Sequence, residues 1–180
     1  MRDRHVRKFI WLGLLGVVVL VWGCATTQSA AVVKAPYSPA RHRAVKIESC
    51  QDLTGNAGTR NLQEEATKIL TEKLKAMKLF EISTDAPLTM TCNIESFAEG
   101  SALKRWIGPW EKGATQTTVA VMVWEQPGDK MLVMLRDRSS VESGGLYSIG
   151  ADQYIFDTVF DSIIKQLEAW TKGHDVEGAK

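Results

Sequence analysis

The side chains that most often carry out catalysis are poorly distributed in this sequence for a packed active site. A Ser or Cys nucleophile needs a base within hydrogen-bond reach, and that base is most often His. The three His residues are His5, His42 and His174, which fall in an N-terminal leader, a Pro-containing segment and the C-terminal tail. The same distribution argues against a zinc site. We therefore expect no catalytic residues, no metal and no enzymatic activity.

Two carboxylate pairs and one glycine pair deserve the same test. Glu95 with Glu99, and Asp157 with Asp161, lie on expected solvent faces, where charged side chains are ordinarily solvated. Residues 55–58, Gly-Asn-Ala-Gly, lack the Lys-Ser/Thr ending and the Gly spacing of a phosphate-binding loop. A turn before a helix explains them better. A hydrolytic function is therefore the least favoured of those that we consider.

The clearest chemistry belongs to Cys24. A basic start at residues 1–8 and an apolar run at residues 9–22 are the parts of a secretory signal, and the run is shorter than the roughly 18 residues of a membrane-spanning helix. Residues 21–24, Val-Trp-Gly-Cys, resemble the bacterial lipobox. We expect residues 1–23 to be a removed lipoprotein signal peptide and Cys24 to carry diacylglycerol and an N-linked acyl chain, which together anchor a protein stably.

The alternative for Cys24 is an ordinary signal peptide that happens to contain a Cys near its end. Ala25, rather than Asp, follows Cys24, and in well-studied Gram-negative lipoproteins this goes with sorting to the outer membrane. We therefore expect a lipid-anchored protein of the cell envelope, at the outer membrane and facing the periplasm. No cofactor is expected beyond the acyl chains.

The mature chain is large enough for one domain. Removing residues 1–23 leaves 157 residues with 18 basic and 20 acidic side chains, a net charge of −2. A chain of this length can bury one core, and a near-neutral charge provides no electrostatic footprint for nucleic acid.

Cys50 and Cys92 remain once Cys24 carries lipid. An oxidising periplasm permits a disulfide between them. Cys92, however, alternates with apolar residues on one face of an expected strand, whereas Cys50 alternates away from the apolar face of its own strand. We therefore favour a buried thiol for Cys92 and keep the disulfide as the alternative.

The remaining sequence predicts a tether followed by one domain. Residues 24–43 are rich in small residues and contain two prolines, which is typical of a flexible tether.

Alternating apolar residues predict strands near residues 45–49, 79–83 and 88–97. Asn61 with Glu64 predicts a helix start, and two apolar arcs predict two helices. The arcs are Leu62, Ala66, Ile69, Leu70, Leu74 and Met77, and Ile155, Phe156, Val159, Phe160, Ile163, Leu167 and Trp170.

A hairpin from residues 115 to 138 is the best-defined element. Pro127 and Gly128 occupy the central positions of a turn, which pairs Glu125 with Lys130 and continues through Val123 with Leu132 to Val119 with Arg136. One face is nearly all apolar and should meet the helices: Ala120, Met122, Trp124, Met131, Val133 and Leu135. The other face is half apolar, and we expect it to be covered or to be a contact surface.

The segment 99–113 combines indoles with cations in a Gly-broken stretch. Amphipathic Trp beside basic residues suits a protein interface or a membrane headgroup layer. The alternative, equally weighted, is a lid in which both indoles cover the second face of the sheet. The candidate partner or membrane contacts are Lys104, Arg105, Trp106, Ile107, Trp110 and Lys112.

The order of elements resembles known bacterial domains over residues 44–171. The first strand, the loop with Asp52 and Gly55, the amphipathic helix and residues 79–82 are similar to the amino-terminal domain of the Tol-system propeller protein and to curli-secretion-type lipoproteins. The later half, with Gly100, Arg105, Gly108 and Gly113 before the hairpin, looks like a bacterial lipoprotein family of unknown function, domain of unknown function 4410. The family brings no catalytic residues.

We therefore predict an α+β domain over residues 44–173: a mixed, mostly antiparallel sheet of four or five strands, with two helices packed on one face. Residues 174–180 are expected to be a disordered tail. The favoured function is a membrane-anchored, non-enzymatic partner or assembly factor in an envelope complex, and the partner is an envelope protein rather than nucleic acid. A lipid-binding or transport-auxiliary lipoprotein is the alternative, and an apolar cavity would indicate it.

Overall fold

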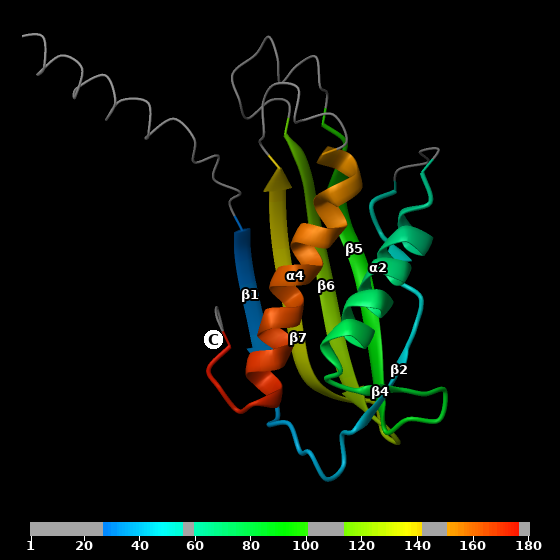
Figure 1. The fold of residues 1–180 in the computed structure, drawn as a ribbon, viewed down its shortest axis with the longest axis vertical. Helices are drawn as coiled ribbons and strands as arrows, with labels where there is room; N and C mark the ends of the chain where they lie inside the picture. Colours follow the sequence, from blue (N-terminus) through cyan, green and yellow to red (C-terminus); the bar gives the residue numbers. More distant parts are fainter. Residues whose placement is uncertain (1–26, 56–59, 101–113, 142–150, 177–180) are drawn as a thin grey trace, which may run out of the picture.

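The computed structural model describes residues 27–55, 60–100, 114–141 and 151–176. Figure 1 shows a two-layer α+β arrangement in which helices α2 and α4 lie on one side of the sheet. The sheet has seven strands in the order β1-β7-β6-β5-β2-β4, with β3 paired to β5, rather than the four or five strands expected. The bounds are β1 Thr27–Val33, β2 Ala44–Ile47, β3 Gln51–Asp52, α2 Leu62–Met77, β4 Glu81–Ile82, β5 Leu88–Ala98, β6 Thr115–Glu125, β7 Lys130–Val141 and α4 Ala151–Thr171.

The predicted mixture of strand directions is confirmed. Strands β1, β7, β6 and β5 pair antiparallel, whereas the short strands β2, β3 and β4 pair parallel. Most of the paired residues therefore belong to the antiparallel part, and the parallel strands form one edge of the sheet.

The segment expected to be a flexible tether contains the first strand. β1 pairs antiparallel with β7, and Ala31 lies opposite Leu135 with only 2% of its surface exposed. Beyond β1, the backbone N–H groups of Lys34 and Ala35 donate to the carbonyl of Leu132. The sequence signal is weak because β1 contains small and polar residues, and an edge strand can be held by backbone hydrogen bonds.

Helix α2 begins where the sequence predicts. The Asn61 side chain accepts a hydrogen bond from the N–H of Glu64 at 3.1 Å, which satisfies one of the N–H groups left unpaired at a helix start. It also donates to the Glu64 carboxylate at 3.0 Å. Lys78 ends the helix in the left-handed conformation. The buried residues are Leu62, Ala66, Leu70 and Leu74, whereas Met77 is 40% exposed.

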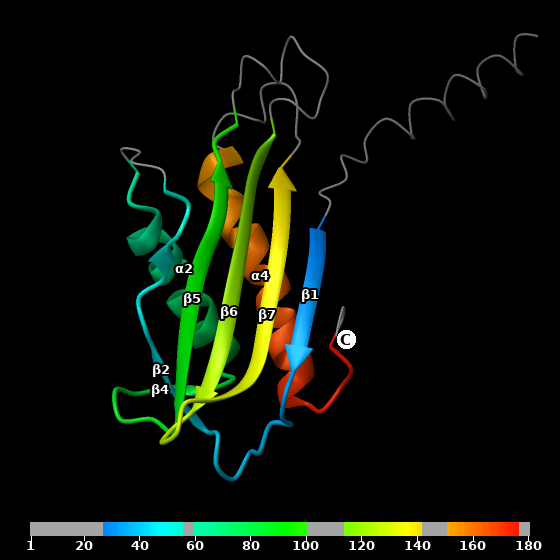
Figure 2. The same cartoon turned by 180° about the vertical axis from the view of Figure 1, so that it is seen from behind.

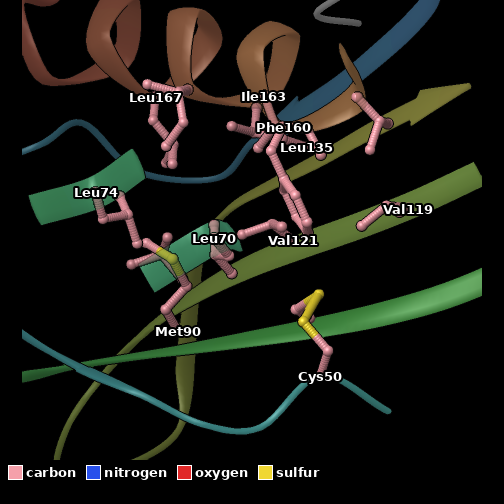
Figure 3. Close-up of a cluster of buried hydrophobic side chains, with 14 of the residues drawn as sticks. Cys50, Leu70, Leu74, Met90, Val119, Val121, Leu135, Phe160, Ile163 and Leu167 are labelled. Atoms are coloured by element: carbon pink, nitrogen blue, oxygen red, sulfur yellow. A yellow bond between two sulfur atoms is a disulfide. The ribbon is translucent and has the colours of Figure 1, made fainter. Parts of the chain in front are cut away.

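The core lies between the two helices and one face of the sheet. All seven residues of the predicted α4 arc are buried. Figure 3 shows Phe160, Ile163 and Leu167 of α4 above Val121 and Leu135 of the sheet. Phe156 stacks on Phe97 of β5 with ring centroids 5.9 Å apart. Burial of this apolar surface is the main force that holds the helices on the sheet.

A β-bulge in the hairpin reverses the predicted faces of β6. Glu125 pairs with Lys130 and Trp124 with Met131, as expected, but Val123 then pairs with Val133, and the register shifts there. Leu132 is the additional residue, and a bulge of one residue inverts every side chain beyond it relative to the partner strand. The core-facing residues of the hairpin are therefore Val119, Val121 and Val123 of β6 and Leu132, Val133 and Leu135 of β7, not Ala120, Met122 and Trp124 of β6.

Cys50 and Cys92 are joined by a disulfide, so the favoured buried thiol for Cys92 is wrong. Their Cα atoms are 4.4 Å apart, a spacing that suits a disulfide. Both residues are almost fully buried, and the N–H of Cys50 donates to Thr67 Oγ1 of α2 at 2.8 Å. The bond links the segment after β2 to the central strand β5.

The domain extends past residue 173. The N–H of His174 donates to the carbonyl of Ala169 at 2.9 Å, and Val176 is 6% exposed within the core cluster. Part of the segment expected to be a disordered tail is therefore packed. Within the described part of the chain, neither helix has the length and apolar character to cross a membrane.

Candidate functional site

The two faces of the sheet differ in what covers them. Both described helices pack on the face that holds the core, and Figure 2 shows the opposite face of β1, β7, β6 and β5 with no described helix in front of it. We call this surface the open face. Its residues are Ala30 and Val32 of β1, Met134, Arg136 and Arg138 of β7, Gln116, Thr118, Ala120, Met122 and Trp124 of β6, and Thr89, Thr91, Asn93 and Glu95 of β5.

An apolar row crosses the open face. Val32 pairs with Met134 and Met134 with Met122, so the three apolar side chains lie side by side across three strands. Thr91 of β5, opposite Met122, extends the row with a polar residue. All four are partly exposed. Because methionine is flexible and polarisable, such residues adapt to the shape of a partner surface.

Charged residues flank this row on the side toward the start of β1. Arg136 pairs with Glu95 across β7, β6 and β5, with Nε and Oε2 2.6 Å apart. Arg138 donates a hydrogen bond to the neutral amide oxygen of Gln116 at 2.9 Å, and no carboxylate of the described residues pairs with it. The three charged side chains beside the apolar row thus carry a net positive charge, with Arg138 the cation that lacks a described carboxylate partner.

Trp124 lies at the other side of the row. Its Nε1 donates to Thr91 Oγ1 of β5 at 3.0 Å, which satisfies the indole and fixes its orientation. Beside it is a shallow hollow of about 660 Å³. The hollow is lined by Lys46, Glu48, Thr84, Asp85, Ala86, Thr89, Thr91, Trp124, Gln126 and Asp129, most of which are polar or charged.

The alternation that exposes Arg136 and Arg138 buries Asp137 on the other side of β7. Asp137 is fully buried and accepts hydrogen bonds from Ser29 of β1 at 2.7 Å and Ser139 at 3.1 Å. Ser162 of α4 donates a third hydrogen bond, at 2.5 Å. A buried carboxylate requires such donors, so this cluster joins β1, β7 and α4. It was not predicted, because no periodic pattern marks a buried acid.

His42, which we placed in a tether, is packed at the hairpin end of the domain. It is 1% exposed, its Nδ1 accepts from the N–H of Ser38 at 3.0 Å, and its Nε2 lies 3.1 Å from Glu125 Oε1. This hydrogen bond lowers the pKa of Glu125; desolvation opposes it, and the charge of Arg41 adds to it. The expectation that no His is fixed by packing is therefore wrong. The contacts of His42 join the segment before β2 to the end of β6.

Three of the four carboxylates considered as catalytic groups are paired with cations. Asp157 and Asp161 both contact Lys73 of α2, at 3.1 and 2.6 Å. Burial alone would lower the pKa of Lys73, but these hydrogen bonds outweigh it and raise the pKa. Glu95 is paired with Arg136. No group of three metal-binding side chains occurs among the described residues.

The structure tests only part of the predicted site. Cys24 and the six candidate contact residues from Lys104 to Lys112 lie outside the described residues. The segment that holds those six is bracketed by Gly100 and Ala114. We expected the second face of the hairpin either to be covered or to be a contact surface. No described helix covers it, and the bulge gives it residues other than those expected: Met122 and Trp124 belong to it, whereas Val121 and Val123 do not.

Solved structures of bacterial proteins share this fold at low sequence identity. A hypothetical protein from Chlamydia trachomatis is 12% identical with a TM-score of 0.51, and the match covers 73% of this chain and 99% of that chain. A protein from Xanthomonas campestris, assigned to the family DUF330, is 8% identical with a TM-score of 0.51, covering 79% and 92%. These two likenesses show the fold.

A lipoprotein from Neisseria meningitidis is 4% identical with a TM-score of 0.45, and the match covers 69% of this chain and 97% of that chain. No protein-family model and no curated protein matches the sequence. Membership of domain of unknown function 4410 therefore stays a prediction.

Proposed function

We propose that this chain is a lipid-anchored envelope protein that acts by binding a protein partner on its open face. The observation that carries the proposal is the partly exposed row of Val32, Met134 and Met122 next to Arg136 and Arg138, on a sheet face that no described helix covers. Apolar side chains flanked by arginines are typical of binding surfaces.

The anchor is Cys24, and the support for it is the signal-like leader and the lipobox-like residues 21–24. Two or more acyl chains hold a protein on a bilayer stably, whereas one does so only marginally. The outer membrane, with the domain facing the periplasm, is the location that Ala25 favours. Protein with Cys24→Ala should leave the membrane fraction and appear in the soluble periplasm.

The charge of the open face indicates the chemistry of the partner. Arg138 is bound to a neutral amide rather than to a carboxylate of the described residues, and a guanidinium pairs best with a carboxylate in a bidentate arrangement. We therefore infer a protein surface that presents apolar side chains next to at least one Asp or Glu. The residues Lys104 to Lys112 remain candidate contacts to a partner or to the membrane.

The alternative of a lipid-binding or transport-auxiliary module has weaker support. The core residues between helices and sheet are almost fully buried, and the hollows beside Trp124 and along α2 are lined mainly by polar and charged side chains. An acyl chain needs an apolar cavity. We also propose that the protein binds its partner without catalysis, rather than acting as an envelope hydrolase.

Photocrosslinking in the native envelope tests the proposal. A photoreactive residue at Val32 should form a discrete protein adduct, and the same residue at Lys68, on the solvent side of α2, should not. Arg138→Glu should abolish the adduct and Arg138→Lys should retain part of it, because the partner surface is acidic. Adducts that are identical at both positions, or unaffected by charge reversal, would contradict the proposal.

A further inference from the structure

β1 begins so close to Cys24 that the anchor determines which end of the domain meets the membrane. Thr27 is the first residue of β1, three residues after Cys24. A fully extended chain spans at most about 3.6 Å per residue, so roughly 11 Å separates the two positions at most. We propose that the end of the domain at which β1 begins lies against the lipid headgroups. This inference rests on the proposed lipidation of Cys24.

The strand register defines this end, which we call the proximal end. Thr27 pairs with Ser139, Ser139 with Thr117, and Thr117 with Phe97, so these residues lie in one row. Beyond the row, β5 and β7 end and β6 begins, and the start of α4 lies at the same end in Figure 1. The termini of five elements therefore gather near the chain segment that carries the lipid.

The described surface of the proximal end has side chains that suit a headgroup layer. Tyr154, in the first turn of α4, is 63% exposed, and tyrosine is enriched where an apolar ring meets both lipid and water. Leu53 is 56% exposed, and its N–H donates to the carbonyl of Ile94, close to the row of Phe97. These are the two most exposed of the large hydrophobic side chains in the described residues.

The opposite end of the domain is then held far from the bilayer. β7 runs for 12 residues from Lys130 to Val141, and at about 3.3 Å per residue it spans roughly 40 Å. The hairpin turn, with Gln126 and Asp129 and the hollow beside Trp124, lies at its far end. The open face stands between the two ends, its strands running away from the membrane.

Lipid-dependent quenching tests this orientation in the full, lipidated chain. The purified protein is reconstituted in vesicles of phosphatidylethanolamine and phosphatidylglycerol that contain a lipid with a nitroxide headgroup. A fluorophore is attached to Tyr154→Cys, Glu99→Cys or Asp129→Cys, one at a time. These sites are exposed, and Cys50 and Cys92 are bonded to each other, so the label is selective.

We expect the labels at Tyr154→Cys and Glu99→Cys to lose most of their emission and the label at Asp129→Cys to keep it. Inserting about ten Gly and Ser residues between Thr26 and Thr27, which adds a flexible tether, should relieve the quenching at the proximal sites. Equal quenching at all three sites, stronger quenching at Asp129→Cys, or proximal emission that stays high would overturn the orientation.

The mass of the purified chain separates this failure from failure of the proposed anchor. A chain with acyl mass that is oriented otherwise overturns only the orientation. A chain with no acyl mass and no association with vesicles overturns both.

Discussion

The two faces of the sheet are built from the same strands but differ in how deeply their side chains are buried. The covered face has Val121, Leu135 and their neighbours fully buried under Phe160, so each position is constrained by packing. The open face alternates with it residue by residue, yet its apolar row is partly exposed and its arginines are exposed. The covered face therefore determines stability, and the open face is where we propose that a partner binds.

The largest effect on stability should come from the covered face. Phe160→Ala removes a fully buried ring and should lower the free energy of unfolding by about 3–5 kcal/mol, because it loses buried apolar surface and leaves a cavity. Urea unfolding followed by tryptophan fluorescence measures this. A loss as small as that of Met134→Ala would remove the distinction between the faces.

The disulfide should have the next largest effect. Cys50 and Cys92 close a loop with a sequence separation of 42, and breaking such a cross-link costs about 2–4 kcal/mol, because the unfolded chain gains conformational freedom. The double variant Cys50→Ser/Cys92→Ser should therefore unfold at lower urea concentration. Wild-type protein under reducing conditions should approach the same midpoint; an unchanged midpoint in both would show that the bond contributes nothing.

The contact between Glu125 and His42 should appear as pH dependence. The pKa of Glu125 is lowered from 4.5 by the hydrogen bond with His42, so its contribution to stability is present above pH 4.5 and is lost as the pH falls through the lowered pKa. Glu125→Gln should reduce the decline in thermal unfolding temperature between pH 4.5 and lower values. An identical decline in wild type and variant would mean that the contact is not stabilising.

The smallest effect on stability should come from the open face. Arg138→Glu and Met134→Ala should change the free energy of unfolding by less than about 1 kcal/mol, because both side chains are at least partly exposed. Their effect should instead be on crosslinking at Val32. Loss of crosslinking in Arg138→Glu must come from the changed charge and not from unfolding. The variant Arg138→Lys, which keeps the charge, is the control and should retain part of the crosslinking.

The sequence predicts the helices better than the surfaces. Helix α2 follows from Asn61 and Glu64, and α4 follows from its apolar arc, because both signals are local and periodic. The two faces of β6 could not be assigned in this way, because no sequence pattern marks the bulge at Leu132. Met122 and Trp124 therefore lie on the open face and not on the core face that we predicted. Strand β1 was also not predicted, because its small and polar residues are typical of a linker.

The candidate site shows the same division. A second hairpin face with partial apolar character is predictable from alternation alone, but its membership depends on register. Asp137 and His42 are missed for a different reason: their burial depends on partners far along the chain, Ser162 for the first and Glu125 for the second. Local pattern contains no information on such contacts.

Methionine oxidation in intact envelopes tests the central claim most directly. Met122 and Met134 lie on the open face, whereas Met77, 40% exposed on α2, is a natural control on the other side of the domain. We predict that Met122 and Met134 oxidise more slowly in native membranes than in the purified protein, while Met77 oxidises at the same rate in both. Equal rates for Met122 and Met134 in the two preparations would show that no partner covers the open face.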